Sequence, residues 1–120
     1  MRRLFGFVVA IVFVMPVWAA DAGQPGASST DGKKIFLTYC ANCHGRHGLG
    51  DGAAGKLLPT PPYNLSWSTA KDEYLRQLIS KGGDAMDRAP EMPAWGKILT
   101  PVQIDAVILH LKTLRRTAGQ

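Results

Sequence analysis

Two cysteines and a histidine stand together in the run Cys40-Ala41-Asn42-Cys43-His44. Each thiol can add across one vinyl group of a porphyrin to form a thioether, and the adjacent imidazole can bind the iron of the same ring. In a helix, Cys40, Cys43 and His44 occupy positions i, i+3 and i+4 and project from one face, as a flat ring lying along that face requires. The spacing C-x-x-C-H is the attachment pattern of a c-type haem. The sequence therefore predicts one covalently bound redox cofactor, haem c.

Three other interpretations of these residues are weaker. A thioredoxin-like C-x-x-C pair needs no histidine after its second cysteine, and no alternation of strands and helices surrounds this pair. A zinc site would add His47 to the set, but Cys43 and His44 are adjacent and would not both point at one tetrahedral ion. A disulfide between Cys40 and Cys43 would close a loop too short to constrain much of the unfolded chain. Haem attachment is favoured over all three.

A methionine is the expected second axial ligand of the iron. Met86 and Met92 are the two methionines beyond the N-terminal segment. Met92 lies in the run Ala89-Pro90-Glu91-Met92-Pro93, where two prolines stiffen a loop that could hold a thioether over the ring. Met86 has the commoner role of methionine, a flexible filler of the core. Met92 is favoured, with Met86 or no methionine ligand as the alternatives.

Two further histidines could bind iron by element alone. His47 is too close in sequence to His44 to reach the opposite face of the ring. His110 falls in the middle of an expected helix, where a packing contact is the commoner role. Neither is expected to be a ligand.

The N-terminal segment predicts export. Arg2 and Arg3 precede an apolar stretch over residues 4–18 that is followed by small residues, the pattern of a secretory signal over 1–20. This stretch is shorter than the roughly 20 residues that a membrane-spanning helix needs. Cleavage after Ala19 or after Ala22 would both fit. We expect a periplasmic protein with no integral membrane span after cleavage, and the alternative is anchoring by the uncleaved segment.

Composition and charge predict one small domain. Residues 21–30 are rich in Gly, Pro, Ser and Ala and form an expected flexible leader, which leaves 31–116 as a single folded domain. The formal charge of +5 includes two arginines of the signal; without them 12 basic residues face 9 acidic ones. Because no basic stripe remains, nucleic-acid binding is not expected.

Helical periodicity and capping residues predict three main helices and no strand. The first helix is expected over 31–40, with Thr30 or Asp31 as its N-cap. The second is expected over 70–80, capped by Thr69 and ended by Gly82-Gly83, and the third over 101–115. The third has the best signals: Thr100 as N-cap, Pro101 at the first position, Gln103 completing a capping box, and Leu99 packed against Ile104. The predicted apolar faces are Tyr74, Leu75, Leu78 and Ile79 on the second helix and Ile104, Val107, Ile108, Leu111 and Leu114 on the third.

A long irregular segment, residues 45–66, separates the first two helices. Its glycines and the prolines Pro59, Pro61 and Pro62 exclude a regular helix or a central strand. An unstructured segment of this length needs something to pack on in so small a domain. A porphyrin would supply that surface.

With these motifs in this order, nearly all of the chain beyond the signal resembles the class I c-type cytochromes. The motifs are Cys40-Ala41-Asn42-Cys43-His44-Gly45, Gly48-Leu49-Gly50-Asp51-Gly52, Pro62-Tyr63-Asn64-Leu65, Met92-Pro93-Ala94-Trp95-Gly96 and Leu99-Thr100. The resemblance implies an all-α, cytochrome c-like fold of three to five helices around one haem. It also implies His44 and Met92 as axial ligands.

The resemblance further implies that the first and last helices cross. Gly32 and Phe36 match the small and aromatic positions of the first helix in this family, whereas His110 stands where the last helix usually carries an aromatic residue. Ala53 replaces a proline that often follows the glycine at Gly52. The backbone carbonyl that orients the His44 ring is therefore assigned to Pro59 only as a guess.

The function implied is electron transfer without substrate turnover of its own. A methionine ligand stabilises ferrous iron, so the protein is expected to accept electrons from a dehydrogenase or reductase complex and pass them to a terminal acceptor. We expect a monomer or a weak complex with redox partner proteins. Alternatives are a haem c subunit of a larger dehydrogenase or oxidase assembly and, less favoured, a gas-binding or peroxidatic haem protein. The basic residues Lys33, Lys34, Arg46, Lys56 and Lys97 are expected around the haem edge, facing an acidic partner.

Overall fold

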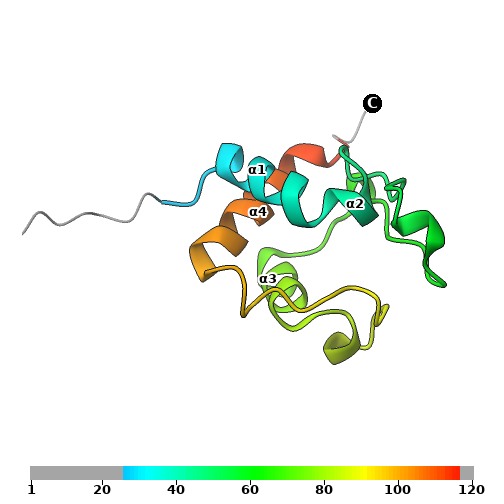
Figure 1. The fold of residues 1–120 in the computed structure, drawn as a ribbon. Coiled ribbons are helices and arrows are strands. Elements are labelled where there is room, and N and C mark those ends of the chain that lie inside the picture. Colours follow the sequence, from blue (N-terminus) through cyan, green and yellow to red (C-terminus); the bar gives the residue numbers. More distant parts are fainter. Residues whose placement is uncertain (1–25, 117–120) are drawn as a thin grey trace, which may run out of the picture.

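The computed structural model describes residues 26–116, which form an all-α arrangement (Figure 1). Its elements are α1 (Ser29–Tyr39), α2 (Ala41–His44), the 3₁₀ turns η1 (Gly55–Leu57) and η2 (Leu65–Trp67), α3 (Asp72–Lys81), η3 (Asp84–Met86) and α4 (Pro101–Leu114). Four α-helices and no strand among these residues confirm the predicted fold class. The expected signal over 1–20 and the first half of the leader lie outside the described residues. Within 26–116, none of the helices has both the length and the apolar character needed to cross a membrane.

Helix α1 begins two residues earlier than the sequence predicted. Its N-cap is Ser28, whose hydroxyl oxygen accepts the Asp31 backbone N–H at 3.1 Å and donates to the Asp31 carboxylate at 2.6 Å. The expected caps, Thr30 and Asp31, are wrong because the Ser28 hydroxyl already accepts the free Asp31 N–H and the helix begins at Ser29. The acidic Asp31 instead lies in the first turn, where it complements the positive end of the helix dipole.

Helices α1 and α4 cross in direct backbone contact, as expected. An added Cβ atom on Gly32 would lie 1.8 Å from the carbonyl oxygen of Ala106, so only glycine permits this approach. Further along the same interface, the rings of Phe36 and His110 meet edge to face at a centroid distance of 5.3 Å. His110 therefore replaces the missing aromatic residue, and the contact between rings is kept.

His110 should make stability depend on pH. Burial first, and the positive charge of Lys33 second, lower the pKa of His110 from its ordinary value of 6.5. Because the unfolded chain then binds this proton more readily, the free energy of unfolding should fall as pH drops below about 6.5. We expect His110→Phe, which keeps a ring against Phe36, to flatten this dependence in urea unfolding at a series of pH values. Parallel curves for the two proteins would contradict the assignment.

Helix α3 lies below the α1–α4 pair in Figure 1 and is joined to α4 by charged side chains. Arg76 donates to Asp105 at 2.8 Å, and Lys112 pairs with Asp72. The expected cap Thr69 is wrong: the N-cap is Lys71, which makes no side-chain capping bond. The predicted end is confirmed, since Gly82 follows the last turn with a φ of 82°.

Helix α4 begins as the sequence predicted. The Thr100 hydroxyl accepts the Gln103 N–H at 3.3 Å, and the Gln103 side chain accepts the Thr100 N–H at 2.9 Å, which completes the capping box. Its buried residues are Ile104, Ala106, Val107, Ile108, His110 and Leu111. The predicted apolar face is confirmed except at Leu114, which is half-buried near the end of the helix.

The two threonines proposed as caps offer a matched comparison. Thr100→Ala should lower the free energy of unfolding by about 1 kcal/mol, since it leaves the Gln103 N–H without its acceptor. Thr69→Ala should change it by less than about 0.5 kcal/mol, because Thr69 is exposed and caps no helix. Chemical denaturation of the two variants measures both values. Equal losses would show that the capping box does not stabilise α4.

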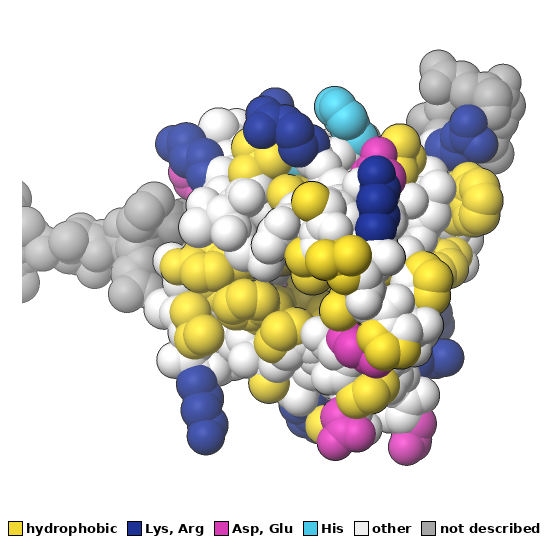
Figure 2. Space-filling model, turned by 45° about the vertical axis from the view of Figure 1, so that its right-hand side comes forward, with side chains coloured by type: hydrophobic (Ala, Val, Ile, Leu, Met, Phe, Trp, Pro, Cys, Tyr) yellow, Lys and Arg dark blue, Asp and Glu magenta, His cyan; other side chains and the backbone are white. Residues whose placement is uncertain are grey.

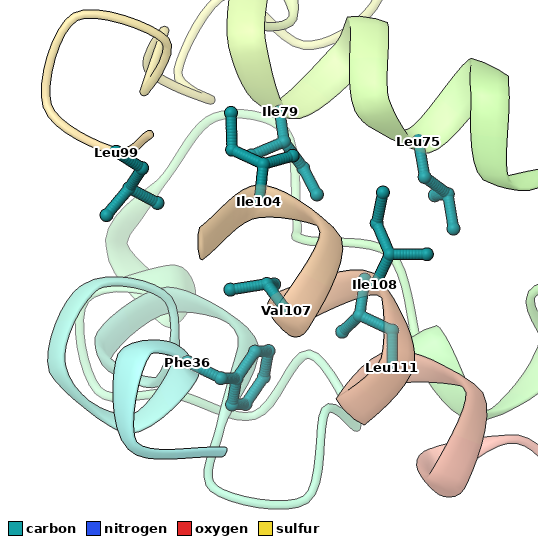
Figure 3. Close-up of a cluster of buried hydrophobic side chains, with 8 residues drawn as sticks. All are labelled: Phe36, Leu75, Ile79, Leu99, Ile104, Val107, Ile108 and Leu111. Atoms are coloured by element: carbon teal, nitrogen blue, oxygen red, sulfur yellow. The ribbon is translucent and has the colours of Figure 1, made fainter. Parts of the chain in front are cut away.

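The hydrophobic core lies between α1, α3 and α4 (Figure 3). Its eight buried members are Phe36, Leu75, Ile79, Leu99, Ile104, Val107, Ile108 and Leu111. Of the stripe expected on α3, Leu75 and Ile79 are buried, whereas Tyr74 and Leu78 are half-buried. Partly buried side chains extend this cluster, among them Cys40, Met92 and Trp95. The core therefore reaches two residues that the sequence singled out for chemistry.

Candidate functional site

The short helix α2 places the two cysteines and the histidine on one turn. The N–H groups of Cys43 and His44 both donate to the carbonyl of Cys40, at 3.2 and 2.9 Å. This is the helical spacing that the sequence predicted for attachment of a ring along one face. Both thiols are free and half-buried. Among the described residues, no three His, Cys, Asp or Glu side chains are grouped to hold a metal ion.

The glycine-rich segment after α2 folds back over the end of that helix. Backbone N–H groups of Gly50, Gly52 and Ala54 donate to the carbonyls of His44, Cys43 and Asn42, at 2.8, 3.2 and 2.9 Å. These are the carbonyls that a helix end leaves without partners. The segment thus packs on α2 itself, and its hydrogen bonds fix the turn that carries the attachment residues.

Close backbone approach explains the glycines of this segment. An added Cβ atom on Gly52 would lie 2.6 Å from the Cys43 carbonyl oxygen, and one on Gly55 would lie 2.3 Å from the same atom. Gly45 has a φ of 78°, which side-chain-bearing residues rarely adopt. Glycine is therefore required at these three positions around α2.

Burial sets the protonation state of the thiol and the imidazole. It raises the pKa of the Cys40 thiol to about 12, with a smaller contribution from the neighbouring Cys43. Burial also lowers the pKa of His44, opposed by the backbone carbonyl of Tyr63. A neutral imidazole is the form that binds a metal. Burial therefore favours the neutral imidazole of His44 in the protein without its cofactor.

The backbone carbonyl of Tyr63 lies near the His44 ring. The Nδ1 atom of His44 is buried without a hydrogen-bond partner, and the Tyr63 carbonyl opposes the lowering of the His44 pKa. Pro59, the expected partner, makes no hydrogen bond with His44 Nδ1 among the described residues and stays a prediction. Tyr63 is held in place because the Leu65 N–H donates to the Gly48 carbonyl at 2.7 Å. The signal in the sequence was the run Pro62-Tyr63-Asn64-Leu65.

Met92 lies half-buried against the core on a loop fixed by backbone bonds. Its carbonyl accepts the Gly83 N–H at 2.9 Å, and its own N–H donates to Ala89 at 3.1 Å. The N–H groups of Trp95 and Gly96 donate to carbonyls in the last turn of α3, at 2.9 and 3.0 Å. The Met92 loop, residues 88–96, is therefore attached to the end of α3.

Aromatic packing connects this loop to the cysteine motif. The Trp95 ring contacts the ring of Tyr39 at a centroid distance of 5.3 Å, and Tyr39 directly precedes Cys40. Cys40 and Met92 both pack against the buried core, whereas Met86, in η3, is not among the side chains that do. The structure thus brings the Met92 loop and the cysteine motif onto one core.

Hydrophobic side chains also gather on the surface. Figure 2 shows them as a band across the middle of one face, where the surface is hollowed. Large apolar side chains that are at least two-fifths exposed are Tyr39, Leu49, Leu57, Tyr63, Trp67 and Ile98. So much exposed apolar surface on a small domain is typical of a site for a ligand or a partner. Two half-buried thiols, a buried imidazole nitrogen and apolar surface together fit a covalently attached macrocycle.

Comparison with known proteins gives the family. The family described as cytochrome C oxidase, cbb3-type, subunit III matches residues 27–111. The chain is 34% identical over 97 residues to the cbb3-type cytochrome c oxidase subunit FixP of Azorhizobium caulinodans and 32% identical over 115 residues to subunit CcoP of Azospirillum brasilense. These matches cover 80% and 94% of this chain but 30% and 36% of the two relatives, so the chain spans about a third of their length.

Two further proteins are similar over more of their length. The match to cytochrome c6 of Rippkaea orientalis is 31% identical over 114 residues and covers 92% of each protein. A solved chain of the Kuenenia stuttgartiensis reducing HAO-like protein complex superposes with a TM-score of 0.62 at 29% identity, covering 76% of this chain and 44% of that one. The chain therefore belongs to the cbb3-type subunit III family, and it is a monohaem class I c-type cytochrome that carries electrons on a covalently bound haem c.

Proposed function

We propose that this cytochrome carries electrons in the periplasm with His44 and Met92 as axial ligands, between a donor dehydrogenase or reductase complex and a terminal acceptor, without substrate turnover of its own. Two contacts of the Met92 loop support the ligand pair. Met92 and Cys40 pack against the same core, and Trp95 of the loop contacts Tyr39, which precedes Cys40. The match to cytochrome c6 along 92% of both proteins favours a mobile carrier.

Each residue of the site has a defined task. The haem supplies a one-electron iron couple when bound. Cys40 and Cys43 would hold the haem through two thioethers, and the turn of α2 keeps them on one face. His44 would hold the iron through Nε2, and the nearby Tyr63 carbonyl would orient the ring by accepting from Nδ1–H. Met92 offers a neutral sulfur from a loop that is already ordered, and this preorganisation compensates for a weak ligand.

A second candidate is a haem c subunit of an oxidase assembly. The family match and the FixP and CcoP relatives favour it, since these are subunits of cbb3-type oxidases by name. The two candidates differ in their stable partners. A carrier purifies alone at physiological salt, whereas a subunit copurifies with a larger oxidase.

Carbon monoxide binding tests the ligand pair. In the reduced wild-type protein, Met92 should block carbon monoxide at the iron. Met92→Ala should open the site, so that reduced protein binds close to one equivalent in an optical titration. Met86→Ala is the matched control and should behave as wild type, because Met86 belongs to η3 and not to the Met92 loop. Ready binding by the wild type would contradict the Met92 assignment and favour a gas-binding protein.

A further inference from the structure

Arg88 and Tyr74 join the start of the Met92 loop to α3. The Arg88 Nε–H donates to the Tyr74 hydroxyl oxygen at 2.8 Å, and the guanidinium carbon lies 5.9 Å from the centroid of the same ring. One arginine therefore makes both a hydrogen bond and a cation–π contact with one tyrosine. Arg88 is the first residue of the loop, and Tyr74 belongs to the first turn of α3. We call this pair the Arg88–Tyr74 contact.

Tyr74 gives the loop a fixed point of attachment. Its side chain is half-buried and packs against the hydrophobic core. The far end of the loop is held differently, by the backbone bonds of Trp95 and Gly96 to the last turn of α3. At the near end, the Arg88 N–H donates to the Gly83 carbonyl at 2.9 Å. The Arg88–Tyr74 contact thus adds a side-chain link to the core at the end of the loop that leaves η3.

Arg88 makes this contact although carboxylates are closer in sequence. Asp84, Asp87 and Glu91 all lie within four residues of it. In the part of the chain that the structure describes, Arg88 nevertheless takes part in no ion pair. A guanidinium at the surface ordinarily finds its strongest partners in carboxylates. Its direction toward Tyr74 is therefore set by how the loop packs on α3, and not by the neighbouring charges.

The residue before Arg88 has a strained backbone. Asp87 has a φ of 51° and a ψ of 42°, and no other described residue with a side chain has a positive φ. This left-handed conformation costs free energy and persists where surrounding contacts hold it. The turn at Asp87 sets the direction in which the loop leaves η3. A contact made by the next residue opposes relaxation of that turn.

The start of the loop is connected to Met92 through the backbone. The Met92 N–H donates to the Ala89 carbonyl, and the Met92 carbonyl accepts the Gly83 N–H. Arg88 directly precedes Ala89 and accepts no part of the ligation itself. A displacement of Arg88 from α3 would therefore be passed to Met92 by these two hydrogen bonds.

We propose, on the basis of the function proposed above, that Arg88 and Tyr74 are positioning residues that keep the Met92 thioether at the haem iron. Loss of their contact lets the start of the loop move away from α3. The displaced loop is then populated more often, and Met92 spends more time away from the iron. Because a methionine ligand stabilises ferrous iron, the reduction potential should fall with it.

Amide hydrogen exchange of the reduced holoprotein, followed by NMR, tests the contact directly. Tyr74→Phe removes the hydroxyl acceptor and keeps both the ring and the net charge. We expect the N–H groups of Gly83 and Met92 to exchange about fivefold faster in this variant, since one hydrogen bond is lost. Arg88→Gln should have at least the same effect, because it also removes the cation–π contact. Combining the two changes should give no more than Arg88→Gln alone, since both act through one contact.

The reduction potential shows whether the loop displacement reaches the iron. Tyr74→Phe should lower it, and because no charge is removed the fall reports on the ligand and not on electrostatics. Arg76→Gln is the matched control. It also removes a guanidinium from α3, but Arg76 donates to Asp105 of α4 at 2.8 Å. This variant should leave loop exchange and the potential as in wild type.

Three results would overturn the positioning role. They are unchanged exchange of Gly83 and Met92 in Tyr74→Phe, equal effects of Arg88→Gln and Arg76→Gln, and faster exchange of the loop with an unaltered potential in Tyr74→Phe. Ready carbon monoxide binding by the reduced wild type would instead remove the Met92 ligation on which the role depends. The carbon monoxide titration of the wild type thus separates failure of the ligand pair from failure of the Arg88–Tyr74 contact.

Discussion

Valine in place of Gly32 is expected to lower the free energy of unfolding by at least about 3 kcal/mol, a large part of the stability of a domain of this size. The reason is steric. A Cβ atom at this position would lie 1.8 Å from the Ala106 carbonyl oxygen and 2.9 Å from the Val107 backbone nitrogen. Both neighbours are backbone atoms, so α1 and α4 can relieve the overlap only by moving apart. The Phe36–His110 contact would be lost with them.

Gly26→Val is the control for this prediction. Gly26 precedes α1, and an added Cβ atom there meets nothing within 4 Å. Denaturant unfolding of both variants, followed by helical circular dichroism, separates the effect of the helix crossing from the general effect of a larger side chain. A Gly32→Val protein within about 1 kcal/mol of wild type would show that the two helices can pack at a greater distance.

The helices with the strongest local signals were predictable from the sequence. The start of α4 needed only Thr100, Pro101 and Gln103, because a capping box is made by neighbouring residues. The α1–α4 crossing followed from the resemblance, through Gly32 and Phe36. The Phe36–His110 contact was not predictable in the same way, since it depends on a distance between two helices that no local pattern encodes.

The wrong N-cap predictions for α1 and α3 show that several neighbouring residues can fit the same local signal. Ser28, Thr30 and Asp31 are all good N-cap residues within four positions, so composition could not rank them. The structure selects Ser28 because one hydroxyl then serves both as acceptor and as donor to Asp31. The prediction of Thr69 as the N-cap of α3 was wrong for a related reason. A threonine before a helical pattern is a cap only if the helix begins directly after it.

The attachment residues were predictable, but their support was not. The spacing of Cys40, Cys43 and His44 indicates haem attachment without any knowledge of the fold. The support consists mainly of backbone hydrogen bonds, such as Gly50 N–H to the His44 carbonyl at 2.8 Å. Because every residue type offers the same carbonyl, the sequence could not identify Tyr63 as the group facing the His44 ring.

The backbone hydrogen bonds that hold the Met92 loop were likewise not predictable from the sequence. The sequence explained its stiffness by Pro90 and Pro93, whereas the structure adds backbone bonds to Gly83 and to the last turn of α3. Gly83 was predicted only to end a helix. In the structure an added Cβ atom on Gly83 would lie 1.9 Å from the Ala89 carbonyl oxygen and 3.3 Å from the Met92 Cβ atom. Gly83 therefore lets the loop lie flat against the end of α3.

Gly83→Val should consequently detach Met92 without altering its sulfur. The valine side chain displaces Ala89 and breaks the Gly83 N–H bond to the Met92 carbonyl, so the loop can no longer hold the thioether in place. We expect the reduced variant to bind carbon monoxide nearly as fully as Met92→Ala, and to lose about 2 to 3 kcal/mol of unfolding free energy. Optical titration and denaturation measure the two effects separately.

Two controls show whether carbon monoxide binding by Gly83→Val results from displacement of the Met92 loop. Ala85→Val adds a similar bulk at an exposed position two residues away and should leave carbon monoxide excluded. Denatured Gly83→Val should keep its haem through extraction with acidified organic solvent, because Cys40 and Cys43 are untouched. Exclusion of carbon monoxide by Gly83→Val, with its stability reduced as expected, would mean that the thioether holds its position without the loop. The ordered backbone of residues 88–96 would then have no part in ligation.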